Sequence, residues 1–348
     1  MQWFGNRLGL DVSYYTKKTS NQILTAEVSK ASGFNSALVN AGVISNRGIE
    51  AQVNLTPIRT NDGRFEWDMT MNYGRNKNRV DALYGNLQTI SLGGLWYLTD
   101  EARLGYPYGS MFGVGYLRCG NYDPTSTSDP VQQARLSALA AATTACPKDG
   151  SANGELLLRS GHPQAEPSSA KRVLGNYTPN WTGGIDNTFH YRGVDFGFLI
   201  DTRQGGSVYS VGNMWGMYSG VLQATAFRPD SGLLINGIDS KTGKENTQHV
   251  RTEDYYHSLY PIQEAWIYDA SFVKLREARI GFAIPQRFLR GTTIRNARLS
   301  IVGRNLALWS KAPNIDPETA FSSGNVQGIE MGQIPTARSV GFQLTVTP

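Results

Sequence analysis

The sequence predicts an all-β protein whose sheet contains eight antiparallel strands. Apolar and polar residues alternate with a period of two in eight segments, which is typical of strands. Short and long connections also alternate between these segments. Charged residues make up 18% and aromatic residues 11% of the 348 residues, with 38 glycines. Soluble domains carry about 25% charged residues, so a charged α/β enzyme is disfavoured. The 40% hydrophobic content and net charge of +5 disfavour a disordered chain.

The alternation can be followed from one end of the chain to the other. It is clearest where Phe65, Trp67 and Met69 alternate with Glu66 and Asp68. The remaining segments are residues 7–15, 49–56, 181–191, 194–203, 294–304 and 339–346. In residues 270–284 the apolar positions change parity midway, which predicts a β-bulge or a change of environment.

The connections predict an up-and-down barrel wall. Short connections are expected at residues 57–63, 192–193 and 285–292, and long ones at about 19–44, 80–179, 205–268 and 307–337. Loops longer than about 15 residues are uncommon in compact domains. Short turns at one end and long loops at the other are the pattern of an outer-membrane β-barrel.

The strand pattern allows two environments. In a membrane barrel the apolar face meets lipid, whereas in a soluble sandwich it forms the core. The mean hydropathy of -0.34 is compatible with both. Aromatic residues near strand ends favour the barrel, because interfacial girdles lie there: Trp3, Phe4, Tyr14, Phe65, Trp67, Tyr73, Trp181 and Tyr191. The sandwich remains the alternative.

Other functional classes find little support in the sequence. The basic residues are scattered, with Arg75, Lys77 and Arg79 as the only tight alternating group, so nucleic-acid binding is not expected. The four histidines are far apart, and no catalytic motif is present. We therefore expect no enzyme activity, metal or cofactor.

Several stretches resemble the SusC/RagA-type TonB-dependent receptors of Gram-negative outer membranes. Asn40–Glu50 (NAGVISNRGIE) is similar to a segment at the start of a barrel strand, and Val173–Gly184 (VLGNYTPNWTGG) to a loop-to-strand segment. Tyr268–Arg276 (YDASFVKLR) and Gly303–Leu306 (GRNL) resemble strand segments near the C-terminus of the family. With Gly105–Ser110 and the final strand, the resemblance covers essentially the whole chain.

The resemblance implies a fold and a function. Residues 1–348 would form the C-terminal portion of a transmembrane β-barrel, about eight of 22 strands, with long extracellular loops and short periplasmic turns. Nothing in the chain resembles the family's plug domain or TonB box. The complete receptor would lie in the outer membrane and import oligosaccharides or peptides, with a SusD-like lipoprotein as lid and the TonB complex supplying energy. A soluble or surface all-β glycan-binding module is the alternative, and a passive porin is a third option.

Two sets of residues are the predicted contact sites. Polar strand positions are expected to face the lumen and contact the plug: Glu50, Gln52, Asn54, Asp68, Asn72, Asp186, His190, Asp201 and Arg203. Aromatic residues crowd the long loops: Trp96, Tyr97, Tyr106, Tyr108, Trp215, Tyr218, Tyr255, Tyr256, Tyr260, Trp266 and Trp309. Such rings either stack on substrate or pack the loops together. The first candidates for substrate binding are Trp215, Tyr218, Tyr255 and Tyr256.

Cys119 and Cys146 both fall in the longest predicted loop, on either side of the helix-prone residues 131–145. Two cysteines in one loop of a cell-surface protein predict a disulfide, with two free thiols as the alternative.

Overall fold

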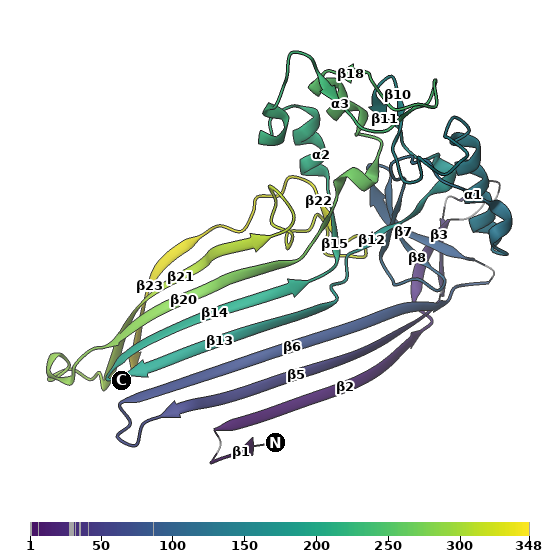
Figure 1. Cartoon of the computed structure of the whole chain (residues 1–348). Coiled ribbons are helices and arrows are strands. Elements are labelled where there is room, and N and C mark those ends of the chain that lie inside the picture. The colour runs from purple at the N-terminus through teal and green to yellow at the C-terminus, as the bar shows by residue number, and fades with distance from the viewer. Residues whose placement is uncertain are drawn as a thin grey trace.

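The computed structural model describes residues 2–5, 7–27, 31, 33–34, 36–40, 42–85 and 87–347. Ala41, which belongs to the segment that carries the family resemblance, lies outside the described residues, as do residues 28–30, 32, 35 and 86 of the expected long loops. The described chain forms one long curved sheet, with a separate group of small sheets and helices beyond one end of it (Figure 1).

The large sheet is entirely antiparallel, in agreement with the predicted all-β class. Its order is β1-β2-β5-β6-β13-β14-β20-β21-β23. These strands are β1 (Gln2–Trp3), β2 (Leu8–Ser20), β5 (Val43–Arg59), β6 (Phe65–Ala82), β13 (Trp181–Tyr191), β14 (Val194–Gln204), β20 (Phe272–Ala283), β21 (Asn296–Ser310) and β23 (Ser339–Thr347). The strands of this sheet lie side by side in the order in which they occur in the chain, so the sheet runs up and down.

Several strands are longer than the apolar alternation indicated, above all β5 and β6. β5 has 17 residues and β6 has 18, and both continue toward the long connections. The added part of β6 still alternates. On the face that carries Phe65 and Tyr73, however, its residues are Arg75, Lys77 and Arg79 rather than apolar residues. The parity change in residues 270–284 corresponds to a bulge, because the pairing of β20 with β21 shifts between Leu275 and Glu277.

The two ends of the large sheet differ. At one end, strands are joined by residues 60–64, by Arg192–Gly193 and by residues 284–295. Arg192 and Gly193 both have positive φ (48° and 86°), as a two-residue hairpin turn requires. At the other end, strands are joined by residues 21–42, 83–180, 205–271 and 311–338, and these connections contain secondary structure of their own.

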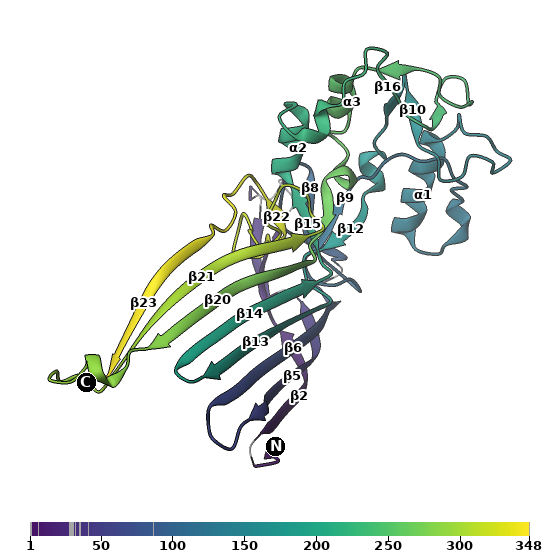
Figure 2. The same ribbon diagram turned by 60° about the vertical axis from the view of Figure 1, so that its left-hand side comes forward.

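The long connections fold into small sheets and short helices. The small sheets are β12-β9-β8-β7, β19-β15-β22, β11-β10-β17, β16-β18 and β3-β4. Their strands are β3 (Ile23–Glu27), β4 (Ser36–Asn40), β7 (Thr89–Leu95), β8 (Leu98–Arg103), β9 (Ser110–Gly113), β10 (Leu157–Arg159), β11 (His162–Pro163), β12 (Arg172–Asn176), β15 (Ser207–Ser210), β16 (Leu233–Leu234), β17 (Ile238–Asp239), β18 (His249–Val250), β19 (Ile267–Asp269) and β22 (Ile329–Glu330). The helices are α1 (Pro130–Ala142), α2 (Val211–Tyr218) and α3 (Thr252–Ser258). We call this part the loop region; Figure 2 shows it projecting beyond one end of the large sheet.

The buried core lies in the loop region rather than in the large sheet. Its main cluster joins Leu98 and Met111 with Tyr209, Trp266 and Ile329, drawn from three of the long connections. A second cluster contains Leu139 of α1 together with Cys119, which forms a disulfide with Cys146 at a Cα–Cα distance of 5.6 Å. Within the described residues, no helix is both long and apolar enough to cross a membrane.

The large sheet has one apolar and one polar face. Directly paired residues point to the same side of a sheet. Ile185 lies between Met71 and Ile200 on one face, and Asp186 lies between Thr70 and Leu199 on the other. Gly48 of β5 is on the polar face, where Tyr15 lies over it: a Cβ at Gly48 would be 2.3 Å from the Tyr15 ring and 2.7 Å from the Arg75 carbonyl oxygen. Only glycine fits there.

Candidate ligand-contact site

Aromatic side chains from several long connections meet on one side of the loop region. The ring of Trp215 lies 5.4 Å from Trp96, 5.5 Å from Tyr218 and 5.5 Å from Tyr260, measured between centroids. We call Trp96, Tyr97, Trp215, Tyr218, His257 and Tyr260 the loop aromatic cluster. Edge-to-face contacts such as these are the arrangement that aromatic pairs prefer, and they fix the orientation of each ring.

Helix α2 places the two central rings. Its N-cap is Ser210, whose Oγ accepts a hydrogen bond from the Asn213 backbone N–H at 3.0 Å. Trp215 and Tyr218 are three residues apart, so they lie on the same helical face. The Tyr218 ring stacks on His257 of α3 with 4.0 Å between centroids, and the His257 ring nitrogen Nε2 is 3.0 Å from the Tyr218 carbonyl oxygen. These contacts between two members of the cluster hold α2 and α3 together.

A two-residue turn between β7 and β8 supplies two more rings. Leu95 pairs with Leu98 across this turn, and Trp96 and Tyr97 both have positive φ, 50° and 68°. For residues other than glycine, adopting this left-handed conformation costs about 1–2 kcal/mol per residue. The hydroxyl of Tyr209 donates a hydrogen bond to the Trp96 carbonyl oxygen at 3.2 Å, which helps to hold the turn. Strained positions of this kind are concentrated at functional sites.

The structure separates the four predicted aromatic residues into two pairs. Trp215 and Tyr218 are 38% and 37% exposed and belong to the loop aromatic cluster. Tyr255 and Tyr256 of α3 are half-buried and contact each other at 5.2 Å. The Tyr256 hydroxyl donates to the Ala224 carbonyl oxygen at 2.9 Å, and burial raises the pKa of both tyrosines. Tyr255 and Tyr256 therefore pack against the buried core of the loop region and are not part of the loop aromatic cluster.

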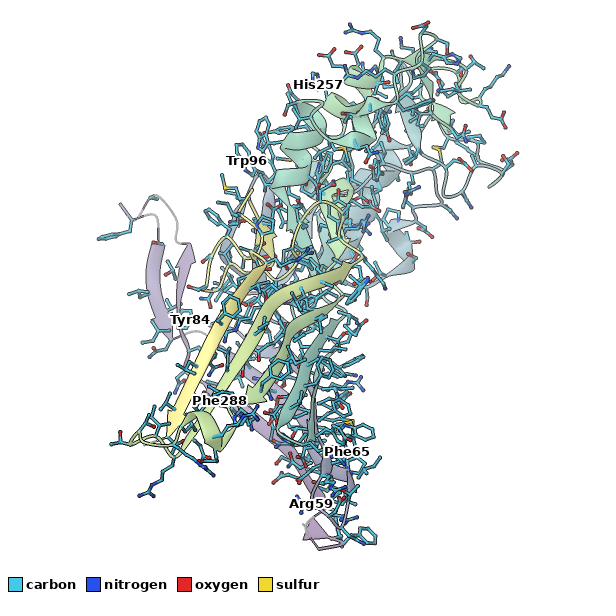
Figure 3. All side chains as sticks on the ribbon, turned by 90° about the vertical axis from the view of Figure 1, so that its left-hand side faces the viewer. Arg59, Phe65, Tyr84, Trp96, His257 and Phe288 are labelled. Atoms are coloured by element: carbon cyan, nitrogen blue, oxygen red, sulfur yellow. A yellow bond between two sulfur atoms is a disulfide. The ribbon has the colours of Figure 1, made fainter. Side chains whose placement is uncertain are left out.

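The exposed part of the cluster presents flat rings to the outside. Tyr97 is 66% exposed, next to the partly exposed Trp215 and Tyr218. In Figure 3, Trp96 and His257 lie in the loop region, while Arg59 and Phe65 lie at the far end of the large sheet. Such rings stack on sugar rings and on apolar or planar peptide side chains. Among the described residues, no group of three or more His, Cys, Asp or Glu side chains could hold a metal ion.

The polar strand residues come together on one face of the large sheet. Glu50, Gln52 and Asn72 line a shallow groove with Asp11, Ser13 and Thr182. Asn54 Oδ1 accepts hydrogen bonds from Gln52 at 3.3 Å and from Thr70 at 3.0 Å, and Asp68 accepts one from Thr56 at 2.7 Å. Asp186 lies on the same face, beside Thr70.

Three more of these polar residues are engaged within the chain. His190 Nδ1 contacts the Asp195 carboxylate, and Arg203 donates to the Tyr177 carbonyl oxygen. Asp201 accepts two hydrogen bonds from the Arg276 guanidinium, both at 2.8 Å. A ligand or another domain would have to compete with these contacts.

An ion network that sequence analysis did not find joins the large sheet to residues 311–338. Lys274 of β20 is only 2% exposed, and its Nζ donates to Asp316 at 2.8 Å and to Glu318 at 2.6 Å. Arg276 also binds Glu318, at 2.6 Å. The signal in the sequence was a lysine and an arginine two positions apart in an otherwise apolar strand start, but the acidic partners are more than 40 residues away.

Curated relatives cover the chain almost completely, although no family model matches it. The TonB-dependent receptors P3 and P26 of Formosa agariphila are each 27% identical to it over 99% of its length. The chain spans about a third of each relative, 32% and 33%.

Solved structures show the same fold. A chain of the RagAB peptide transporter superposes with a TM-score of 0.65 at 16% identity, and one of the RagAB peptide importer in the open-open state with a TM-score of 0.61 at 17% identity. The match covers 99% of this chain and about a third of each of those chains, 34% and 33%. The resemblance found in the sequence is confirmed: this chain is a homologue of the TonB-dependent receptors along its whole length, with the fold of part of a RagAB transporter chain.

Proposed function

We propose that residues 1–348 form the C-terminal barrel wall and the extracellular loops of a TonB-dependent outer-membrane transporter. The complete transporter imports oligosaccharides or peptides together with a SusD-like lipoprotein. The observation that carries this proposal is the similarity to TonB-dependent receptors over 99% of the chain, on a sheet whose apolar face is exposed.

The exposed apolar face favours lipid over a second sheet. Val12, Ile49 and Phe342 on this face are 60%, 45% and 77% exposed. A soluble sandwich buries such a face against another sheet about 10 Å away. In Figures 1 and 2 no described element lies along the large sheet in that way. Outer-membrane lipid is the environment that suits these side chains, which supports the proposed location in the outer membrane of a Gram-negative bacterium.

The opposite face of the sheet then lines the lumen. Glu50, Gln52, Asn54 and Asn72 are available there for contact with a plug domain, whereas Asp201 binds Arg276 of the neighbouring strand β20 and Arg203 binds the Tyr177 carbonyl oxygen in a long connection. The short connections are the periplasmic turns, and the loop region faces the exterior, where a SusD-like partner and the substrate arrive. Coupling to the TonB complex belongs to a part of the receptor that precedes this barrel portion.

The loop aromatic cluster is the proposed substrate contact. Its strained turn and exposed rings suit both substrate classes, and the RagAB fold relatives are peptide transporters by name. Stacking of one aromatic ring on a ligand ring contributes about 0.5–1.5 kcal/mol, so removing two rings should weaken binding about 5- to 150-fold.

A paired substitution in the full-length receptor tests this assignment. We expect Trp215→Ala with Tyr218→Ala to weaken binding of peptide or oligosaccharide mixtures to outer-membrane vesicles and to slow uptake. Phe227→Ala is the matched control, since Phe227 is 71% exposed in the loop region but outside the cluster. Equal affinity of the paired variant and the control would exclude the cluster as the contact site. A chain that purifies as a detergent-free soluble monomer would instead favour the glycan-binding module.

A further inference from the structure

The outward face of the large sheet carries a row of cations beyond its apolar part. Arg75, Lys77 and Arg79 alternate along β6, and Arg47 of β5 lies directly opposite Lys77. Lys18 of β2 lies opposite Ser45, which in turn lies opposite Arg79. We call these five residues the outer cationic cluster. Because direct partners share a face, all of them point to the side that also carries Tyr14, Ile49 and Tyr73.

All five side chains are exposed, and most have no acidic partner. In the part of the chain that the structure describes, Arg79 approaches Asp81 at 4.0 Å, and no acidic side chain is within ion-pair distance of the other four. At the other end of the sheet, where the connections are short, arginines do have acidic partners. Arg59 pairs with Glu66, and Arg64 pairs with Asp62 at 3.2 Å. The cluster therefore concentrates unneutralised positive charge.

The opposite face of the same strand segments is closed. Val80 and Ile44 are 0% and 7% exposed, and they pack with Ala102 of the loop region. The cations therefore cannot reach the lumen without disrupting this packing. Their binding partners must therefore lie on the outer side of the sheet.

The cluster begins where the apolar face ends. Tyr14 and Tyr73 are 70% and 39% exposed, and the Tyr73 ring lies 5.8 Å from the Trp181 ring. Tyr and Trp are enriched at the boundary between hydrocarbon and headgroups. Arg75 is two residues beyond Tyr73, which is a rise of about 5 Å along the membrane normal for a strand tilted by roughly 45°. Arg75, Arg47 and Lys77 are thus at headgroup height.

We propose that the outer cationic cluster binds the phosphate groups of a lipid headgroup in the outer leaflet, of a lipid that carries more than one phosphate. Guanidinium groups bind phosphate through paired hydrogen bonds, and long basic side chains bend toward the interface. Several cations from three neighbouring strands match several phosphates better than a single zwitterionic headgroup. The inference rests on the proposed membrane orientation of the sheet.

Lipid retention by the purified receptor tests the proposal. The probe is a bisphosphorylated glycolipid, with phosphatidylethanolamine for comparison, added to the full-length receptor in detergent and quantified by native mass spectrometry. Each cation near an anionic lipid surface is worth about a five-fold change in affinity. Arg47→Gln, Arg75→Gln and Lys77→Gln combined should therefore weaken glycolipid binding about 100-fold.

Two further variants keep the test decisive. Lys148→Gln, Lys241→Gln and Lys244→Gln together remove the same net charge from exposed positions of the loop region and should leave binding unchanged. Arg75→Lys with Lys77→Arg keeps the charges and should bind within a few-fold of the parent. Inorganic phosphate at millimolar concentration should not displace the lipid, because a free ion lacks the acyl chains that lie on the apolar face.

The outcomes separate this inference from the proposed function. Undiminished glycolipid binding by the triple Gln variant, an equal loss in the loop-region control, or displacement by inorganic phosphate would overturn the lipid site while leaving membrane location and uptake intact. A receptor portion that needs no detergent would overturn the membrane orientation itself, and the lipid site with it.

Discussion

Replacing Asp100 by asparagine should stabilise the loop region at neutral pH. Asp100 is in β8, outside the proposed membrane-spanning part, and is completely buried. Neither of its carboxylate oxygens has a hydrogen-bond partner among the described residues. Burial, and then the adjacent charge of Glu101, raise the pKa of Asp100 to about 8. A buried charge without partners is costly, so the folded protein prefers the protonated acid.

The pH dependence follows from the difference between folded and unfolded states. Because the pKa is raised on folding, the penalty is absent below the unfolded value of 3.8, grows as pH rises, and levels off above about 8. Each pH unit within that window corresponds to about 1.36 kcal/mol. Between pH 5 and 7 the loop region should therefore lose about 2.7 kcal/mol of stability through Asp100, or a factor of about 100 in its opening equilibrium.

Hydrogen–deuterium exchange of the β8 and β9 amides measures this opening. The ratio of protection in Asp100→Asn to that in the parent should rise toward 100-fold from pH 5 to 7, since the intrinsic exchange rates cancel in the ratio. Asp230→Asn, at an exposed position of the loop region, should give a ratio that is independent of pH. A flat ratio for Asp100→Asn would refute the argument that an unpaired, ionising carboxyl is buried there.

Two other substitutions test the large sheet and its link to the loops. Gly48→Ala should lower the free energy of unfolding by about 1–3 kcal/mol, because its Cβ has no room, while Gly341→Ala, with nothing within 4 Å, should change it little; urea titration of heat-modifiable migration compares them. Lys274→Met leaves Asp316 buried without its cation and should cost about 3–5 kcal/mol, seen as faster proteolysis of residues 311–338. Lys311→Met breaks an exposed pair and should cost less than about 1 kcal/mol. Equal effects within either pair would contradict the packing described.

The central parts of the strands were predictable, and their outer ends were not. Alternation of apolar and polar residues marks the part of β5 and β6 that has one apolar face. Toward the loop region, Arg75, Lys77 and Arg79 take the outward positions, so the hydrophobic signal ends while the hydrogen-bonded ladder continues to Ala82. With the proposed membrane orientation, a strand that leaves the hydrocarbon keeps its geometry but loses the composition by which sequence analysis recognises it.

The site could be predicted only in part. Trp215 and Tyr218 were identified because they follow a strand end in a loop rich in aromatic residues. Their neighbours Trp96 and Tyr260 come from other segments of the chain, and the contacts depend on how two long connections, residues 83–180 and 205–271, pack together. The same is true of Lys274 and Asp316, which are 42 residues apart. Long-range packing of this kind leaves no local pattern in the sequence.

The disulfide has a consequence for the order in which the protein is assembled. Cys119 and Cys146 are 27 residues apart, and both lie within the single connection between β6 and β13. Closing this bond requires no pairing between strands of the large sheet. In the proposed transporter, the disulfide can therefore close before the strands of the large sheet pair, and both thiols would then be lost first. Oxidation of this loop and assembly of the large sheet are thus two separable steps, and thiol labelling follows the first of them.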